Sequence, residues 1–397
     1  MALAVLSPRI RGFICTTAHP SGCALNVSRQ IEVAQAARNN PPDPYRVLVV
    51  GSSTGYGLGA RIAATWGFNA DTVGVFFERP PEGKKTATPG FYNTSAFHAR
   101  ALADGRKSFN LNGDAFSHEM KDETIKVIKE NLGQVDLVVY SLASPRRVDP
   151  DTGEIYQSGL KPIGSTYTGK TIDLTKEVIS EVTIEPASDD EMSQTVSVMG
   201  GADLKLWTDA LLGANVLAEG ARIVPFSYIG PQVTWPIYRS GTIGSAKEHL
   251  ESTTAELNEL LGQRVGGQAH ISINKAVVTQ ASSAIPVVPL YMSLLYKLMR
   301  ERGVHEDPIH QMVRLLNEHV APGRHPTLDA ENRIRLDDRE MALPIQSEIN
   351  RLWDEVTTEN FRELSDYDSF KRGFRQLFGF EVDGIDYAQA VETEAGI

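Results

Sequence analysis

The sequence predicts an α/β fold in which a doubly wound parallel sheet of the Rossmann type carries helices on both faces. Apolar runs without polar interruption recur along the chain, and such runs are typical of strands buried on both faces of a sheet. Stretches with helical periodicity separate many of these runs, which implies right-handed crossovers between parallel strands. A glycine-rich segment directly follows the first strong run, as in dinucleotide-binding proteins of this class.

Six strands are predicted from these apolar runs. They cover residues 45–51, 72–78, 108–113, 135–141, 221–228 and 270–279. Amphipathic helical patterns follow three of them, at residues 117–133, 204–220 and 246–264.

Three regions lie outside this alternation. About fifty residues precede the first predicted nucleotide-type strand. Residues 146–190, rich in Thr, Gly and Pro, are predicted to form a small β excursion or a loop over the active site. From about residue 300 the chain becomes helical and charged. No linker is recognisable, so we expect residues 1–397 to form a single domain with this insertion and a helical carboxy-terminal extension.

Composition narrows the function classes. Hydrophobic residues make up 41% and charged residues 22% of the chain, as in ordinary globular proteins. A formal net charge of -11 argues against a nucleic-acid partner. The most apolar stretch, 285–299, contains two prolines and a lysine and is too short to span a bilayer. The amino terminus lacks the charged segment of a secretory signal. We therefore expect a cytoplasmic protein without membrane insertion.

The only two cysteines, Cys15 and Cys23, exclude a disulfide-rich scaffold. With His19 between them they form C-x3-H-x3-C, but a structural zinc site needs four ligands and no second cluster lies nearby. No metal site is expected.

The glycine-rich segment GSSTGYGLGAR begins at Gly51, at the junction between a predicted strand and a predicted helix. Glycines there permit a tight turn and a close approach of the backbone to a pyrophosphate, whose charge is met by amides at the helix amino terminus. The strand–loop–helix context is the one that a dinucleotide-binding motif requires.

Side chains at the ends of the next strands complete this prediction. Glu78 could accept hydrogen bonds from both adenosine ribose hydroxyls and repel a 2′-phosphate, which favours NADH over NADPH. Two alternatives remain, because Glu78 could be a solvated strand end and the neighbouring Arg79 could bind that phosphate. Asp114 could bind the adenine amino group, and Leu142 and Ala143 are small enough to let the cofactor lie close.

A tyrosine and a lysine in YRSGTIGSAK indicate hydride-transfer chemistry. A tyrosine can donate to a developing oxyanion, and a nearby ammonium can increase its acidity. Tyr238 and Lys247 are nine positions apart, so a straight helix at about 100° per residue would place them on opposite faces. Among the twelve tyrosines, only Tyr367 has a lysine four positions on, Lys371, and we interpret that pair as a surface pair on a carboxy-terminal helix.

Several motifs together resemble one enzyme family. RGFICTTAHPSGC, GSSTGYGLGAR, VFFERP, FSYIG, the Y-x8-K pair, VVTQASSAIPVVPLY and FGFEVDGIDY closely resemble the V-type enoyl-acyl-carrier-protein reductases and the related trans-2-enoyl-CoA reductases. The resemblance covers essentially the whole chain. It implies an enlarged, monomeric relative of the short-chain dehydrogenases that uses NADH to reduce the trans-2 double bond of a fatty acyl thioester, the final step of the elongation cycle.

The resemblance also implies roles for individual residues. Tyr238 would be the active-site acid, Lys247 would contact the cofactor, and Tyr228 would contact the substrate near its thioester carbonyl. The cofactor site would be lined by Gly51, Ser52, Ser53, Thr54, Gly55, Tyr56, Phe77, Glu78, Asp114, Ala115, Leu142 and Ala143. Val277, Val278 and Thr279 would close over the nicotinamide end.

This assignment demands an irregular backbone between Tyr238 and Lys247. Gly241 and Gly244 lie between them, so either the helix kinks or Tyr238 precedes a helix that is straight from about Ser245. Pro236 leaves open an earlier helix start.

Residues 282–298 are predicted to form a helix beside the substrate, either lining an acyl channel, acting as a lid, or serving as core. A short-chain ketone or alcohol dehydrogenase and a non-enzymatic NADH-binding sensor are the alternatives to an enoyl reductase. The carrier of the enoyl thioester, acyl carrier protein or coenzyme A, is left open by the sequence.

Overall fold

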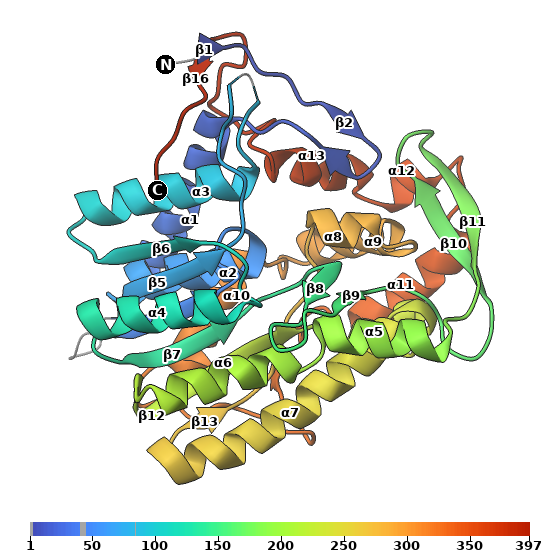
Figure 1. The fold of residues 1–397 in the computed structure, drawn as a ribbon. Helices are drawn as coiled ribbons and strands as arrows, with labels where there is room; N and C mark the ends of the chain where they lie inside the picture. Colours follow the sequence, from blue (N-terminus) through green and yellow to red (C-terminus); the bar gives the residue numbers. More distant parts are fainter. Residues whose placement is uncertain (1–2, 40–44, 84) are drawn as a thin grey trace.

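A computed structural model describes residues 3–39, 45–83 and 85–397 of the chain (Figure 1). Within those residues, eight strands form one central sheet whose paired strands all run parallel. The predicted doubly wound α/β class is therefore confirmed. The strands of this sheet are β4 (Arg46–Val50), β5 (Asp71–Phe76), β6 (Ser108–Asn112), β7 (Val135–Tyr140), β12 (Leu217–Ser227), β13 (Gln268–Ala269), β14 (Ser272–Ile273) and β15 (Ile334–Arg335).

The strand order creates a switch point at the middle of the sheet. Its path is β15-β14-β12-β7-β4-β5-β6, with β13 also paired to β12. The chain enters at β4, proceeds to the β6 edge, and then returns to β7 on the other side of β4. In such sheets a crevice opens where the order reverses, outside the carboxyl ends of the strands.

Helices cover both faces of the sheet (Figure 1). On one face, α1, α2, α3 and α10 share a core with residues such as Val47 and Val49. On the other, α4, α6 and α7 pack around residues such as Leu48 and Val50. The alternation along β4 is the period of two expected of a strand buried on both sides. These helices are α1 (Pro20–Ala36), α2 (Gly55–Ile62), α3 (Pro89–Ala103), α10 (Pro308–Leu315), α4 (His118–Asn131), α6 (Ala202–Gly213) and α7 (Thr242–Val265).

The prediction of one long strand over residues 270–279 is wrong. Only β14, with β13 before it, belongs to the sheet. After β14, the backbone N–H groups donate hydrogen bonds to side chains from other parts of the chain. In a longer strand they would donate to the carbonyls of a neighbouring strand. The hydrogen bonds run from Lys275 N to Gln311 Oε1 (3.1 Å), from Ala276 N to Glu340 Oε2 (2.7 Å), and from Val278 N to Tyr296 Oη (3.0 Å).

The insertion forms two β-hairpins, as the prediction of a small β excursion anticipated. The first pairs β8 (Arg146–Val148) with β9 (Ile155–Gln157), and the second pairs β10 (Tyr167–Asp173) with β11 (Val178–Ile184). The second hairpin docks on the carboxy-terminal extension, where Lys170 Nζ donates to the carbonyls of Trp353 (2.7 Å) and Asp354 (2.9 Å). These carbonyls lie at the end of α11 (Leu343–Glu355), where a cation complements the helix dipole.

The carboxy-terminal extension is helical, as expected, and packs on the central helix α9 (Val288–Glu301). Tyr367 in α13 (Tyr367–Gln376) is buried, and Lys371 pairs with Glu177 of the insertion. The prediction of a surface pair was therefore wrong for the tyrosine, because the insertion and α9 cover it. The prediction of one helix over 282–298 was also wrong, because α8 (Gln280–Ala284) ends before α9 begins. Most of α9 is buried in the core, and its residues Tyr296 and Arg300 also line a cleft.

The remaining elements are short or peripheral. His19 caps α1, its Nδ1 accepting from Gly22 N at 3.2 Å, and the described residues hold no group of three metal-ligating side chains. Among the described helices, none combines the length and apolar character that a bilayer crossing needs. These elements are β1 (Leu3–Ala4), β2 (Ile10–Arg11), β3 (Ile14–Cys15), β16 (Val391–Glu392), α5 (Asp189–Met199), α12 (Phe361–Leu364), the 3₁₀-helix η2 (Gln232–Ile237) and the π-helices η1 (Ala63–Gly67) and η3 (Leu316–Val320).

Candidate active site

The predicted site residues follow the carboxyl ends of the strands of the central sheet. Because these strands are parallel, the residues after them meet at one edge, on both sides of the switch point. Residues 51–56 follow β4, Phe77 and Glu78 follow β5, Asp114 and Ala115 follow β6, Leu142 and Ala143 follow β7, Tyr228 follows β12, and 277–279 follow β14.

The glycine-rich loop after β4 depends on the absence of side chains at two positions. Gly51 has a φ of +89°, and a Cβ there would lie 2.2 Å from Ser141 O. A Cβ on Gly57 would lie 1.8 Å from Gly51 O. The loop leads into α2 at Gly55, and no side chain caps this helix start. Its first amides can therefore meet the negative charge of a pyrophosphate.

Glu78 is fixed toward this loop. Its Oε1 accepts from Ser53 Oγ at 2.7 Å, and its backbone is bonded in both directions to the side chain of Asn112, at 2.8 Å each. Arg79 is engaged elsewhere, because its guanidinium donates to Thr86 O at 3.0 Å. The carboxylate of Glu78, and not the guanidinium of Arg79, is therefore the group turned toward the glycine-rich loop. Phe77, beside it, is 78% exposed.

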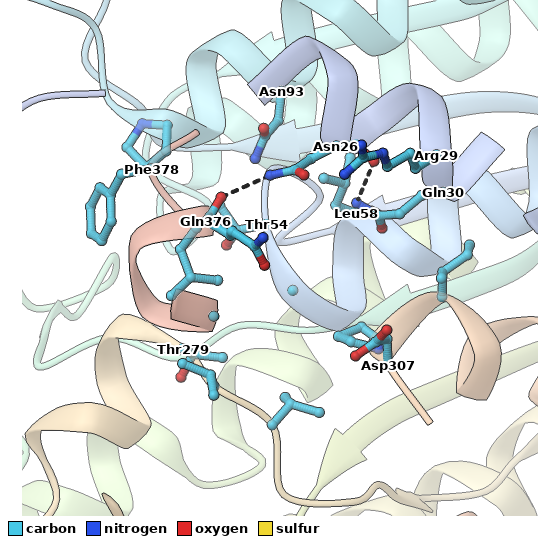
Figure 2. A pocket seen from close by; sticks show the side chains of 18 of the residues that line it. Asn26, Arg29, Gln30, Thr54, Leu58, Asn93, Thr279, Asp307, Gln376 and Phe378 are labelled. Atoms are coloured by element: carbon cyan, nitrogen blue, oxygen red, sulfur yellow. Dashed lines mark hydrogen bonds between the residues drawn. The ribbon is translucent and has the colours of Figure 1, made fainter. Parts of the chain in front are cut away.

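A cleft of 760 Å³ opens beside the loop (Figure 2). Its lining includes the predicted residues Thr54, Gly55 and Glu78, together with 277–279. Other lining residues come from segments that the sequence did not connect with the site: Asn26, Arg29 and Gln30 of α1, Asp307 and His310 at the start of α10, and Arg372 and Gln376 of α13. No motif marks these residues.

Tertiary hydrogen bonds join the walls of the cleft. Asn26 Nδ2 donates to Gln376 O at 2.8 Å, which ties α1 to α13 (Figure 2). Tyr56 Oη donates to Lys275 O at 2.7 Å, which ties the glycine-rich loop to the segment after β14. The chain is therefore anchored to the glycine-rich segment two residues before the predicted closing segment 277–279.

Ten predicted cofactor residues are not part of the lining of this cleft, and neither are Tyr228 and Tyr238. The ten are Gly51, Ser52, Ser53, Tyr56, Phe77, Asp114, Ala115, Leu142, Ala143 and Lys247. Asp114 Oδ1 accepts from Phe116 N at 3.0 Å, and the buried Ala115 accepts at its carbonyl from Lys121 Nζ at 3.1 Å. Leu142 is half-buried and Ala143 exposed. They flank the switch point, where an adenine and the middle of a dinucleotide would lie.

The backbone is irregular before Lys247, as the sequence analysis required. Tyr238 ends the 3₁₀-helix η2 with φ -118° and ψ -85°, and α7 begins only at Thr242. Gly244 N donates to Tyr238 O at 2.9 Å, and a Cβ on Gly244 would lie 1.8 Å from Arg239 O. The glycine thus allows the turn that carries Tyr238 to fold back on the helix. Pro236 lies inside η2 and does not start α7.

Tyr238 packs edge-on against Tyr228, with ring centroids 5.2 Å apart and planes at 72°. Its hydroxyl makes no hydrogen bond to any residue that the structure describes. Burial raises the pKa of Tyr238, whereas the sequence analysis expected Lys247 to lower it. Tyr238 is therefore a neutral phenol at physiological pH, the state in which it can donate.

Lys247 lies in the first turns of α7 and is only 8% exposed. Burial lowers its pKa to about 8, although Glu251 acts in the opposite direction. Its Nζ forms neither an ion pair nor a hydrogen bond with the described residues. The lysine is thus available to ligand hydroxyls.

A doubly wound parallel sheet with a glycine-rich loop between β4 and α2, toward which the carboxylate of Glu78 is turned, is typical of dinucleotide-dependent oxidoreductases. Residues 85–321 match the family model described as the trans-2-enoyl-CoA reductase catalytic region, and residues 5–83 match that of the NAD(P)H binding domain of trans-2-enoyl-CoA reductase. The chain belongs to the trans-2-enoyl-CoA reductase family.

Relatives along the whole chain agree with this assignment. An enoyl-[acyl-carrier-protein] reductase [NADH] of Coxiella burnetii is 52% identical over 99% of this chain and 97% of its own. One from Vibrio cholerae is 52% identical over 98% of each. The trans-2-enoyl-CoA reductase of Treponema denticola, solved in complex with NAD, has a TM-score of 0.93 at 43% identity and covers 99% of this chain and 100% of that one.

Residues 328–391 match a third family model, described as an enoyl reductase FAD binding domain. In this chain Trp353 and Tyr387 of that segment are partly buried. The other aromatic rings of the segment, including Phe361, Tyr367 and Phe370, are buried in the core around α9. They are not open to stack on a flavin ring, and the segment instead contributes Arg372 and Gln376 to the cleft. These residues do not fit a flavin.

Proposed function

We propose that this protein reduces the trans-2 double bond of enoyl thioesters with NADH. The observation that carries the proposal is the hydroxyl of Tyr238, which makes no hydrogen bond to the described residues and whose ring packs against that of Tyr228, just after the end of β12. An unengaged, neutral phenol at this place suits the stabilisation of a developing oxyanion.

Bound NADH supplies the hydride, which adds to the β carbon of the enoyl thioester. Negative charge then develops on the thioester oxygen, and Tyr238 donates a hydrogen bond or a proton to it. Lys247 binds the nicotinamide ribose hydroxyls and orients the cofactor. Tyr228 contacts the substrate near its carbonyl. The proton added at the α carbon comes from solvent or from Tyr238.

Cofactor selectivity in this proposal rests on Glu78. Its carboxylate faces the loop through Ser53, while Arg79 is bonded to Thr86 O. A carboxylate at this position accepts from ribose hydroxyls and repels a 2′-phosphate.

Carrier and oligomeric state are part of the same proposal. Acyl carrier protein and coenzyme A present the same pantetheine thioester, so we propose that either carrier can deliver the enoyl group. We also propose a monomer of 43.5 kDa in solution, as the resemblance to this family implies. Light scattering of the purified protein gives this mass directly.

The experiment follows NADH oxidation by the purified protein on addition of crotonyl-CoA, with NADPH in parallel and the crotonyl group on acyl carrier protein as a second substrate. We expect turnover with NADH and much slower turnover with NADPH. Binding of NADH without turnover on any enoyl thioester would favour a sensor. Turnover of a ketone instead would favour a short-chain dehydrogenase.

A further inference from the structure

A buried carboxylate, that of Glu340, lies behind the two tyrosines of the site. Glu340 precedes α11 and is fully buried. An isolated carboxylate in such surroundings is costly, and buried acidic groups are retained where partners satisfy them. Here the partners come from separate elements that meet at the site.

Both carboxylate oxygens of Glu340 are occupied. Oε1 accepts from the hydroxyls of Tyr228 (3.0 Å) and Tyr291 (2.6 Å), and Oε2 accepts from Ala276 N (2.7 Å). Lys275, next to Ala276, is also buried and gives a compensating positive charge. The carboxylate thus joins the end of β12, helix α9 and the segment after β14.

The hydrogen bond to Glu340 determines what Tyr228 can do. A tyrosine hydroxyl has one proton to donate, and Tyr228 donates it to Glu340. This bond fixes the Tyr228 ring edge-on against Tyr238, whose own hydroxyl has no partner among the described side chains. Tyr238 is therefore the phenol of the pair that is free to donate to a ligand.

We propose that Glu340 is a positioning residue for enoyl reduction, which holds Tyr228 against Tyr238 and ties the start of the nicotinamide-closing segment to the same carboxylate. This inference rests on the proposed function. Nothing in the sequence near Glu340 indicates such a role, because its partners lie between 49 and 112 positions away in the chain.

A double-mutant cycle on kcat and KM tests whether Glu340 acts through Tyr228. It compares wild type, Glu340→Gln, Tyr228→Phe and the double variant with crotonyl-CoA and NADH. We expect Glu340→Gln to lower kcat about tenfold in the wild-type background, because a small displacement of a positioned group is costly. In the Tyr228→Phe background, Glu340→Gln should lower kcat by less than about twofold.

Asp337→Asn is the matched control. Asp337 is a fully buried carboxylate three residues before Glu340, and its partner is Arg335 instead of an active-site tyrosine. We expect this variant to lose stability without a comparable fall in kcat. Glu340→Asp, which keeps the buried charge but shortens the side chain, enters the cycle if Glu340→Gln does not fold.

A second readout does not depend on turnover. With 3-fluorotyrosine at position 228, the fluorine resonance should shift or broaden in Glu340→Gln and remain unchanged in Asp337→Asn. Equal loss of kcat in both backgrounds of the cycle, or a fluorine resonance insensitive to Glu340→Gln, would overturn the inference. Absence of wild-type turnover would instead overturn the proposed function, and the fluorine measurement would still decide the position of Tyr228.

Discussion

Lys247 is buried, and burial lowers its pKa to about 8, so its charge changes within an accessible pH range. The ammonium form predominates below this pKa and the neutral amine above it. We propose that the ammonium form of Lys247 orients the cofactor. We therefore predict that kcat/KM for NADH falls as the pH rises through about 8, where this ammonium loses its proton.

The pH profile of wild type is compared with that of Lys247→Arg, which keeps its charge throughout this range. We expect the variant to be less active and to lack the step near pH 8. A wild-type profile that is flat through this region would show that the lysine charge is not required.

We propose that Glu78 is the residue that distinguishes NADH from NADPH. We predict that Glu78→Gln raises kcat/KM for NADPH by about tenfold relative to NADH, since it removes a charge that repels the 2′-phosphate. Steady-state kinetics with both cofactors measure this ratio. Arg79→Ala should leave it unchanged because Arg79 is bonded to the loop at Thr86. If Arg79→Ala changed this ratio more than Glu78→Gln does, Arg79 and not Glu78 would be the residue that distinguishes the two cofactors.

At the scale of elements, the turn between η2 and α7 decides where Tyr238 points. A Cβ on Gly244 would lie 1.8 Å from the carbonyl of Arg239, so the backbone would have to move. We predict that Gly244→Ala lowers kcat at least about tenfold and costs about 1–3 kcal/mol of unfolding free energy. Activity assays and denaturant titrations check both effects.

Gly262, in the same helix α7, is the control for this substitution. A Cβ there would have its nearest neighbour at 3.9 Å. Gly262→Ala should therefore retain activity and gain up to about 1 kcal/mol from helix propensity. Similar losses in the two variants would contradict a specific role for the turn.

The elements differ in how well the sequence predicted them. Strands such as β4 and β7 were placed within a residue because burial on both faces produces an unbroken apolar run. The segment after β14 has the same apolar character, but its backbone bonds to the side chains of Gln311 and Glu340 instead of to a strand. These hydrogen-bond partners are distant in the chain, so no local sequence pattern predicts that the segment leaves the sheet.

At the scale of the whole molecule, we propose that the chain is one folding unit. One core cluster contains Val47, Val224 and Ile334, one from each of the three segments matched by family models. We predict a single unfolding transition in which near- and far-ultraviolet circular dichroism coincide. A chain ending at residue 327 should not fold, because it lacks β15 and the helices on α9. Two separated transitions would contradict this.

Local motifs predict the glycine-rich loop, Glu78 and the tyrosine–lysine pair, and their roles stay predictions. The irregular backbone before Lys247 is confirmed; helix geometry demanded it on the assumption that Tyr238 and Lys247 act together. The cleft residues on α1 and α13 were not predicted, because residues such as Asn26 and Gln376 are brought together only by the packing of α1 on α13. Ordinary polar residues on helices give no signal of their own.

The central proposal is that Tyr238 is the hydrogen-bond or proton donor of an NADH-dependent enoyl reductase. The decisive measurement compares wild type and Tyr238→Phe for turnover of crotonyl-CoA and, in parallel, for NADH affinity by fluorescence. In Tyr238→Phe we expect kcat to fall by about 10²-fold or more, while the dissociation constant of NADH changes little. Full turnover in the variant would remove Tyr238 from the mechanism.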